Sequence, residues 1–311
     1  MSELARESVT ELCQVELADL SVGAQVCGPA HGPVAILLHG FPYDIHAYAK
    51  VSRLLAHQGV RVIVPYLRGF GTTRFLRADT PRSGEQAALG ADLLALMNAL
   101  GVERAVLAGY DWGGRAACVV AALWPERCAG LVSCNGYNLL DPRTSLAPDV
   151  PANEARYWYQ FYFHGERGRH GLDLHRAALA DLLWRMWSPN WTFSDEVFRQ
   201  TAPAFDNPDF VDVVVHSYRH RYGLVDGDPR YLAIESQLLV RPAILPPTIL
   251  LDGLADGVAV EADSRAHARH FAQLLRHERV PGIGHNFPQE CPEVFAKAVL
   301  ELTARWSDTP P

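Results

Sequence analysis

Three side chains that could do covalent chemistry each follow an apolar run, in the order carboxylate, carboxylate, histidine. Asp111 sits between glycines in GYDWGG after RAVLA, Asp256 lies in LDGLADG after TILL, and His285 closes RVPGIGH. A carboxylate displayed at a turn between strand and helix is an ionised nucleophile at neutral pH, because its ordinary pKa is about 3.9. A histidine oriented by a second carboxylate can activate water. The set predicts attack by Asp111, followed by hydrolysis through His285 and Asp256.

An aspartate nucleophile limits the kind of carbon atom that the protein can attack productively. Attack on an acyl carbon would give a reactive anhydride, whereas attack on a saturated carbon bearing a leaving group gives a stable alkyl ester. His285 is then free to activate the water that hydrolyses this ester. We expect the backbone N–H groups of Phe41 and Trp112 to stabilise the developing oxyanion. Asp252 lies nearer its strand and is a weaker rival to Asp256.

The elements that must position these residues alternate along the chain. Compact apolar runs that end in turns predict strands, and runs with apolar residues at helical spacing predict helices. Strands that are apolar throughout and alternate with helices are typical of a parallel sheet covered on both faces. We expect strands at 34–41, 60–71, 104–111, 128–136, 247–253 and 276–285, and helices at 84–100, 114–124, 263–276 and 290–305.

Residues 141–240 break this alternation. The segment is rich in Trp, Tyr and Phe and reads as short helices punctuated by prolines. We therefore expect a helical cap domain at 141–240, inserted into a core domain made of 1–140 and 241–311. Such a cap would lie over the carboxyl ends of the strands, where open α/β sheets bind ligands.

Five motifs together resemble the aspartate-nucleophile branch of the α/β-hydrolase superfamily, which contains epoxide hydrolases and haloalkane dehalogenases. The resemblance runs from about residue 30 to 305. It implies the α/β-hydrolase fold, with a mostly parallel central sheet flanked by helices and an inserted helical cap, and it implies no cofactor. The motifs are HGFP (39–42), RGFG (68–71), GYDWGGR (109–115), GLADG (253–257) and GIGHNFPQE (282–290).

Two tyrosines favour epoxide chemistry within this branch. An opening epoxide leaves an alkoxide on the substrate, and a tyrosine hydroxyl, still protonated at pH 7, can donate to it. ARYWYQFYFHGERG and VVVHSYRHRYG resemble the two cap motifs of epoxide hydrolases and put Tyr159 and Tyr218 at the catalytic positions. The resemblance implies a small apolar or aromatic epoxide as substrate, hydrolysed to a vicinal diol. The residues expected to contact it are His39, Phe41, Pro42, Trp112 and Trp158.

Two other functions stay open. A hydrolytic dehalogenase could use the same nucleophile, acid and base, and the indoles of the cap could bind a halide. Many dehalogenases, however, carry asparagine where this chain has Phe41, and one subfamily takes its acid from a position where this chain has only Asn135. Arg115 matches an arginine of fluoroacetate dehalogenases that helps bind the substrate carboxylate. Those enzymes carry a second arginine where this chain has Trp112, and a bracing role for Arg115 is the favoured interpretation. A non-catalytic binding protein is expected to lack a triad residue, and none is missing.

Composition excludes several classes of partner. The net charge of −7 and the lack of a basic cluster argue against nucleic acid. The N-terminus is polar and acidic and no apolar run is long enough for a membrane span, so we expect no signal peptide and no membrane partner. Six scattered cysteines without a C-x-x-C pair suit a reducing cytoplasm. The histidines lack metal-ligand spacing, and the oligomeric state stays open.

Overall fold

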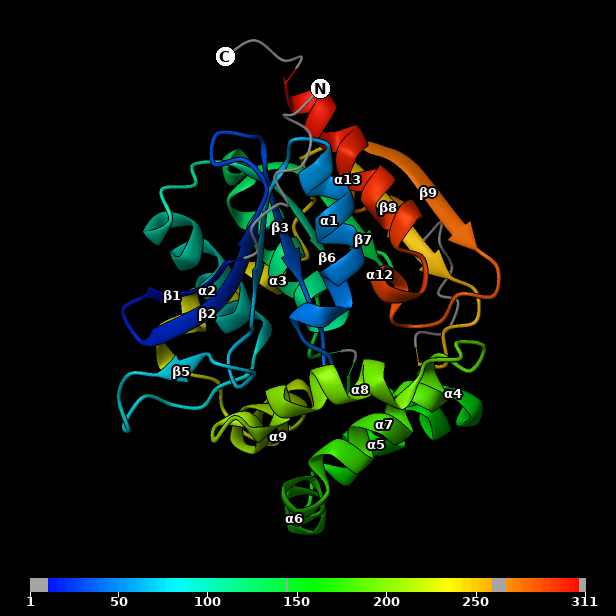
Figure 1. Cartoon of the computed structure of the whole chain (residues 1–311). Coiled ribbons are helices and arrows are strands. Elements are labelled where there is room, and N and C mark those ends of the chain that lie inside the picture. The colour runs from blue at the N-terminus through cyan, green and yellow to red at the C-terminus, as the bar shows by residue number, and fades with distance from the viewer. Residues whose placement is uncertain (1–10, 144, 259–266, 308–311) are drawn as a thin grey trace.

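The computed structural model describes residues 11–143, 145–258 and 267–307. Within these ranges one sheet runs through the molecule in the order β1-β2-β4-β3-β6-β7-β8-β9, and β5 pairs with β2 (Figure 1). The strands are β1 Glu11–Glu16, β2 Leu20–Cys27, β3 Val34–Leu38, β4 Arg61–Pro65, β5 Arg74–Phe75, β6 Ala105–Gly109, β7 Cys128–Cys134, β8 Thr248–Gly253 and β9 Leu274–Val280.

The part of the sheet from β4 to β9 is parallel, as the alternation of strands and helices predicts. Its central strands are buried on both faces, which explains their unbroken apolar sequences. At the carboxyl end of β3, Leu38 pairs with Gly109 of β6. The loops that carry Phe41 and Asp111 therefore leave the sheet side by side.

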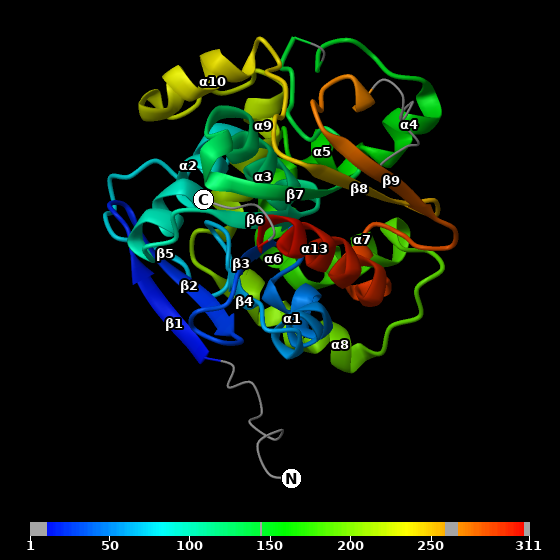
Figure 2. The same ribbon diagram turned by 90° about the horizontal axis from the view of Figure 1, so that it is seen from above.

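Helices cover both faces of this sheet. Helices α2 and α3 pack together on one face, and α1 and α13 pack together on the other (Figure 2). Small residues on α3, among them Gly113 and Ala117, let it approach the strands closely. The helices of these two layers are α1 Ala49–His57, α2 Gln86–Ala99, α3 Asp111–Leu123, α12 Phe287–Glu290 and α13 Pro292–Ser307.

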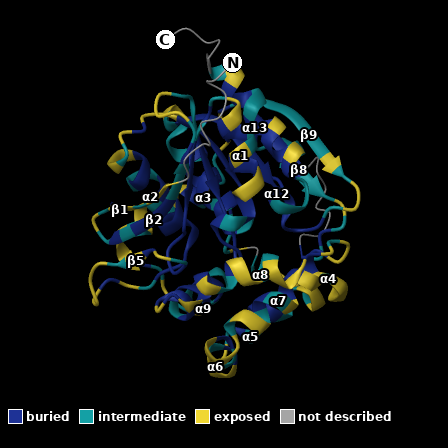
Figure 3. Cartoon of the chain, in the orientation of Figure 1, coloured by how far each residue is buried: buried dark blue, intermediate teal, exposed yellow. Residues whose placement is uncertain are grey.

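A group of short helices lies beyond the carboxyl ends of the strands (Figure 1). Exposed residues are most visible on α4 and α6 (Figure 3), whereas most of α9 is buried. Large aromatic side chains such as Trp184, Trp187 and Tyr218 fill the buried side. These helices are α4 Pro151–Arg156, α5 Trp158–Tyr162, α6 Glu166–Leu174, α7 Arg176–Trp187, α8 Asp195–Thr201 and α9 Phe210–Arg221. The helix α10 Leu232–Leu238 contacts α2.

Some predicted elements need correction. The strand predicted from residue 276 begins at Leu274, so the end of the helix predicted at 263–276 is wrong; residues 259–266 of that region lie outside the described ones. Among the described strands, β9 pairs with β8 alone and is half-exposed, so its sequence mixes polar and apolar residues. The helix predicted at 290–305 is α13, which begins at Pro292 after the separate α12. The antiparallel strands β1 and β2 were not predicted.

Candidate active site

Asp111 lies at a sharp turn between β6 and α3. Its φ is 50°, a left-handed conformation that is strained for a residue with a side chain. The turn is closed by glycines, because a Cβ at Gly113 would lie 2.0 Å from the carbonyl oxygen of Leu38, and one at Gly109 would lie 2.6 Å from Gly113. Only glycines permit this approach, and the turn directs the Asp111 side chain out of the sheet.

The two carboxylate oxygens of Asp111 have different surroundings. The backbone N–H of Phe41 donates to Oδ1 at 2.8 Å, whereas Oδ2 lies 3.8 Å from Nε2 of His285, too far for a hydrogen bond. Burial alone would raise the pKa of Asp111, but the charges of His285 and Arg115 and the N–H of Phe41 outweigh it and lower that pKa to about 2. Asp111 is therefore ionised, and Oδ2 is the oxygen left free to attack.

His285 connects Asp111 to Asp256. Nδ1 of His285 lies 2.7 Å from Oδ2 of Asp256. The Asp256 carboxylate also accepts from Nδ2 of Asn135 at 3.2 Å and from the backbone N–H of Val258 at 2.8 Å. Burial alone would lower the pKa of His285, yet the two carboxylates raise it to about 10. The structure thus brings together the three residues that the sequence singled out.

Asp252, the rival acid, is engaged elsewhere. Its Oδ2 lies 2.5 Å from Nε2 of His277 on the neighbouring strand β9. Since Asp252 is still within β8, its side chain belongs to the sheet, whereas Asp256 lies past the strand in the loop that reaches His285. Among the described residues, Asp256 is the acid in contact with the histidine.

A group of residues that the sequence analysis did not identify holds the His285 loop. The carbonyl oxygen of Trp187 accepts from the N–H groups of His285 at 3.2 Å and Gly257 at 2.9 Å, so the end of α7 ties both acid and histidine loops together. The Ser188 hydroxyl donates to Glu290 at 2.6 Å, and Glu290 also accepts from the N–H of Gly284 at 2.7 Å. Glu290 ends the motif GIGHNFPQE, but nothing in this local sequence indicates these contacts.

Tyr159 of α5 and Tyr218 of α9 lie next to each other, with ring centroids 5.4 Å apart. Both are fully buried, and burial raises the pKa of both hydroxyls well above the ordinary value of 10. The Tyr218 hydroxyl has no hydrogen-bond partner among the described residues. The Tyr159 oxygen accepts from Nε2 of Gln160 at 3.0 Å, another contact that the sequence did not indicate. Both tyrosines are thus protonated donors at neutral pH.

A cavity of about 380 Å³ opens onto the carboxylate of Asp111 and onto His285. One wall is aromatic and comes from the helices over the sheet, and another is polar. Two arginines, from α3 and α9, face the same space. The remaining lining residues are Asn135, Asn138, Ser145, Tyr157, Tyr159, Gln160, Tyr222, Val258, Arg115 and Arg221.

The other predicted substrate contacts lie around this cavity without lining it. The rings of Phe41 and Trp112 stack 5.8 Å apart beside the two tyrosines. The carbonyl oxygen of Pro42 accepts a hydrogen bond from Nε1 of Trp184. The Trp158 side chain is half-buried beside Tyr159. The backbone N–H of Trp112 is in the first turn of α3, where such groups have no intrahelical acceptor, as expected for an oxyanion donor.

His39 has a structural environment. Its Nε2 accepts from the backbone N–H of Leu67 at 3.1 Å, its Nδ1 lies 3.0 Å from the carbonyl oxygen of Gly40, and the side chain is fully buried. Burial lowers the pKa of this histidine, which favours the neutral form that these contacts require. His39 therefore joins two loops rather than facing the Asp111 cavity.

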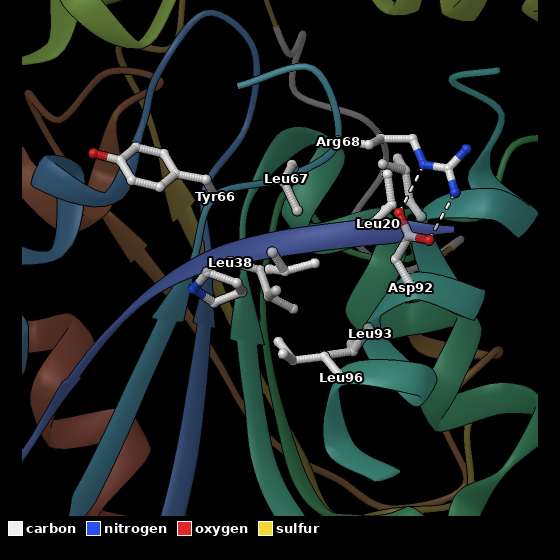
Figure 4. Close-up of a pocket in the computed structure, with 11 residues that line it drawn as sticks. Leu20, Leu38, Tyr66, Leu67, Arg68, Asp92, Leu93 and Leu96 are labelled. Carbon is white, nitrogen blue, oxygen red and sulfur yellow. Dashed lines mark hydrogen bonds and ion pairs between the residues drawn. The ribbon is translucent and has the colours of Figure 1, made fainter. Parts of the chain in front are cut away.

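A second cavity lies between β2, α2 and the loop after β4 (Figure 4). Its volume is about 20 Å³, room for a water molecule and no substrate. Its walls are mainly leucines, and its two charged groups, Arg68 and Asp92, neutralise each other through two hydrogen bonds of 2.7 Å. This cavity is a packing defect rather than a binding site.

Within the described ranges, no group of three or more His, Cys, Asp or Glu side chains is arranged to hold a metal. The helices of residues 11–143, 145–258 and 267–307 all fall short of the length and apolar character of a bilayer-spanning segment. The six cysteines are free thiols.

Comparison with known proteins places the chain in a family. The model of the α/β hydrolase fold family matches residues 33–290. Epoxide hydrolase A of Mycobacterium tuberculosis is 31% identical over 301 residues, which cover 88% of this chain and 91% of that protein. Epoxide hydrolase B of the same organism is 31% identical over 149 residues, 44% of this chain and only 41% of that protein. The match therefore spans less than half the length of epoxide hydrolase B.

A solved structure agrees with this placement. The crystal structure of a candidate epoxide hydrolase from Klebsiella pneumoniae is 44% identical in sequence, with a TM-score of 0.92, covering 94% of this chain and 97% of that one. The chain belongs to the α/β-hydrolase fold family, in the branch that includes epoxide hydrolase A of M. tuberculosis.

Proposed function

We propose that this protein is an epoxide hydrolase that converts an epoxide to a vicinal diol through an alkyl ester on Asp111. The observation that carries the proposal is a pair of buried, protonated tyrosines near an ionised carboxylate. Tyr159 lines the same cavity as Asp111, and Tyr218 packs against Tyr159. The names of the full-length relative and of the 44% identical structure support the same reaction.

The first step is ring opening. Oδ2 of Asp111 attacks an epoxide carbon, the carbon–oxygen bond of the ring breaks, and its electron pair moves to the epoxide oxygen. That oxygen takes a proton from Tyr159 or Tyr218. A neutral donor suits this task because its proton is needed only as the alkoxide develops.

The second step is hydrolysis of the ester. Water attacks Cγ of Asp111 and gives its proton to Nε2 of His285, whose Nδ1–H donates to Asp256. The negative charge develops on Oδ1, which already accepts from the N–H of Phe41 and is expected to gain the N–H of Trp112. Collapse breaks the bond between Cγ and Oδ2, and the leaving oxygen takes the proton held by His285, so the diol departs with the original oxygen of Asp111. The second proton of the water, left on the new carboxyl group of Asp111, returns to the tyrosine that was deprotonated in the first step.

We also propose that 141–240 acts as the cap of a core formed by 1–140 and 241–311. The proposal is supported by the contacts of Trp187, Tyr159 and Tyr218 from this segment with the triad and its neighbours. Free thiols at all six cysteines support a reducing compartment, which we propose is the cytoplasm.

The covalent ester is the direct test. His285→Gln should form the ester with styrene oxide and fail to hydrolyse it, so intact-protein mass spectrometry should show one added substrate mass. Asp111→Ala combined with His285→Gln should show none. If the single variant gains no mass with styrene oxide or with other epoxides, the proposed function is wrong.

A hydrolytic dehalogenase is the second candidate, and the indoles favour it. Nε1 of Trp112 and Nε1 of Trp187 are buried without a hydrogen-bond partner in the described chain, and a leaving halide needs such N–H donors. Their rings lie 6.0 Å from Tyr218 and 5.0 Å from Tyr159 respectively. Bromide release from 1-bromohexane, lost in Trp187→Phe, would identify this activity; styrene oxide turnover without bromide release would exclude it.

A further inference from the structure

The end of α7 packs closely against the two loops that carry the acid and the base. The carbonyl oxygen of Met186 would lie 2.1 Å from a Cβ at Gly257, and Cα of Ser188 would lie 2.5 Å from a Cβ at Gly284. A side chain at either glycine would therefore displace the end of α7. Because the backbones approach this closely, polar groups at the end of α7 reach the loop of His285 directly.

Ser188, directly after α7, supplies a polar side chain at this contact. The residue is buried, and its hydroxyl accepts from the backbone N–H of His285 at 3.1 Å. The same hydroxyl donates to Oε1 of Glu290 at 2.6 Å. A hydroxyl has one proton and two lone pairs, so it can form both hydrogen bonds at once. Ser188 thus connects the backbone of His285 to a carboxylate at the end of α12.

The two oxygens of Glu290 bind the same loop on either side of the histidine. Oε2 accepts from the backbone N–H of Gly284 at 2.7 Å, and Oε1 accepts from that of Asn286 at 3.1 Å. These residues come directly before and after His285. Burial raises the pKa of Glu290, and the hydrogen bonds from Ser188 and the two N–H groups oppose that rise, because they favour the ionised form.

The position of the imidazole matters most in one step of the proposed reaction. During ester hydrolysis Nε2 of His285 takes a proton from water, and this nitrogen is buried without a hydrogen-bond partner among the described residues. The ring is held by the contact of Nδ1 with Asp256 and by the backbone that carries it. During ester formation Oδ2 of Asp111 attacks, and it lies 3.8 Å from Nε2, beyond hydrogen-bond distance.

We propose that Glu290 and Ser188 are positioning residues that hold His285 where it activates the hydrolytic water. The inference rests on the proposed function and assigns both residues to ester hydrolysis rather than to ester formation. Neither side chain is among those that line the cavity of Asp111. They therefore act through the backbone on either side of the imidazole, and not on the substrate.

Glu290→Gln breaks this arrangement without changing the size of the side chain. Glutamine has one acceptor oxygen, whereas the N–H groups of Gly284 and Asn286 point to different oxygens of Glu290. After a single turnover of styrene oxide, the ester should decay about 10- to 100-fold more slowly, the range expected when a reacting group is displaced by up to about 1 Å. Ester formation should keep its rate. Only folded molecules form the ester, so a loss of folded protein does not imitate slower decay.

Ser188→Ala removes the other part of the same contact. It should slow ester decay by about 10-fold. The double variant with Glu290→Gln should be slowed by less than the product of the two single effects, because both act through one hydrogen bond. Glu293→Gln, an exposed glutamate that pairs with Lys50, is the matched control and should keep the unaltered rate. A double variant slowed by the full product would overturn the shared role.

An electrostatic role for Glu290 predicts a different pH profile. Loss of its charge would lower the pKa of His285, so the midpoint of ester hydrolysis would move to lower pH while the rate above the midpoint stayed the same. A positioning role predicts a lower rate above an unchanged midpoint. Ester decay measured between about pH 5 and 10 separates these results. A shifted midpoint with the full rate above it would overturn the inference.

Hydrogen exchange tests the contact without any substrate. In the free protein, the backbone amides of 284–286 should exchange about 10-fold faster or more in Glu290→Gln and Ser188→Ala than in the unaltered protein or the control variant. Mass spectrometry of a peptide that covers 282–290 measures this rate. Unchanged exchange refutes the inference, whatever reaction the protein catalyses.

The outcomes separate this inference from the proposed function. Faster exchange, slower ester decay and an unchanged rate of ester formation support it. Faster exchange with both steps slowed equally refutes a role specific to hydrolysis and keeps the proposed function. Faster exchange without an ester from styrene oxide or any other epoxide, in any variant, refutes the proposed function and still supports the attachment of the His285 loop by Glu290 and Ser188.

Discussion

Nε2 of Gln160 donates to the phenolic oxygen of Tyr159 at 3.0 Å. The orientation of this amide is fixed at its other end, because Oε1 accepts from Arg221 at 2.9 Å and from the hydroxyl of Tyr222 at 3.1 Å. Since the oxygen of Tyr159 already accepts a hydrogen bond, its own proton is directed elsewhere. We infer that Gln160 is a positioning residue that leaves the Tyr159 proton available to the epoxide oxygen.

Replacing Gln160 should therefore affect one step of the reaction. Gln160→Leu should slow ester formation by about 10-fold, the effect of one hydrogen bond worth about 1.5 kcal/mol. Ester hydrolysis should not change, because it needs no proton from Tyr159. Rapid-quench mass spectrometry measures both rates. Gln237→Leu, an exposed glutamine on α10, is the control, and an equal loss in both steps would show that Gln160 acts only through the fold.

The two tyrosines should share proton donation. Tyr159→Phe and Tyr218→Phe should each reduce the rate of ester formation, and the double variant should reduce it by about 10³-fold or more, the range of general acid catalysis. Tyr162→Phe, on the same helix as Tyr159, should retain the full rate. Single-turnover kinetics with styrene oxide measure the effect. An active double variant would mean that another group protonates the epoxide oxygen.

The triad could be predicted from the sequence because each member follows an apolar strand and is marked by local glycines. Asp111 in GYDWGG and His285 in GIGH carry this signal within a few residues. Arg221 and Trp187 carry no such signal: the first ends a cap helix, and the second acts through its carbonyl oxygen, which any residue possesses. Their importance arises from contacts between segments far apart in the chain, which periodicity and turn patterns do not encode.

The same limit applies to the elements of the fold. The central strands are buried on both faces, so their sequences are unbroken apolar runs and were predicted. The outer strands β1 and β9 are partly exposed and pair on one side alone, so their sequences mix polar and apolar residues. Pairing with an adjacent strand, rather than a pattern in the local sequence, determines that these segments form strands.

Asp256 and Asp252 form a matched pair for testing the acid. Asp256→Asn should slow ester hydrolysis by roughly 10³-fold or more, because an amide cannot stabilise the imidazolium of His285. Asp252→Asn should leave this rate unchanged, since its partner is His277 on β9. The rate at which the ester decays after a single turnover is the measurement. Equal effects of the two substitutions would contradict the assignment of Asp256.

The two steps should also differ in their dependence on pH. Ester formation needs an ionised Asp111, whose pKa is about 2, so its rate should be flat from about pH 5 to 8. Hydrolysis needs a neutral His285, whose pKa of about 10 is held up by Asp256 and Asp111. Alkylation removes the charge of Asp111, so the pKa of His285 falls below 10 in the ester. Hydrolysis should accelerate as pH rises through that lower value.

The ester should therefore accumulate at acidic pH. Mass spectrometry of the protein during turnover of styrene oxide should show a larger alkylated fraction at about pH 5 than at about pH 8. His285→Gln should remain alkylated at both values, which assigns the effect to the histidine. An alkylated fraction that rises with pH would contradict this order of protonation events.

The left-handed backbone of Asp111 should carry a measurable cost in stability. Asp111→Gly and Asp111→Ala both remove the nucleophile, so neither should turn over substrate, and their comparison isolates the backbone. At φ = 50° a glycine is unstrained, and Asp111→Gly should be more stable than Asp111→Ala by about 1 kcal/mol. Ala116→Gly, inside the same helix, should instead destabilise the protein by about 1 kcal/mol or more. Unfolding in guanidinium chloride measures all three; if Asp111→Ala is the more stable of the first two, the turn stores no strain at this residue.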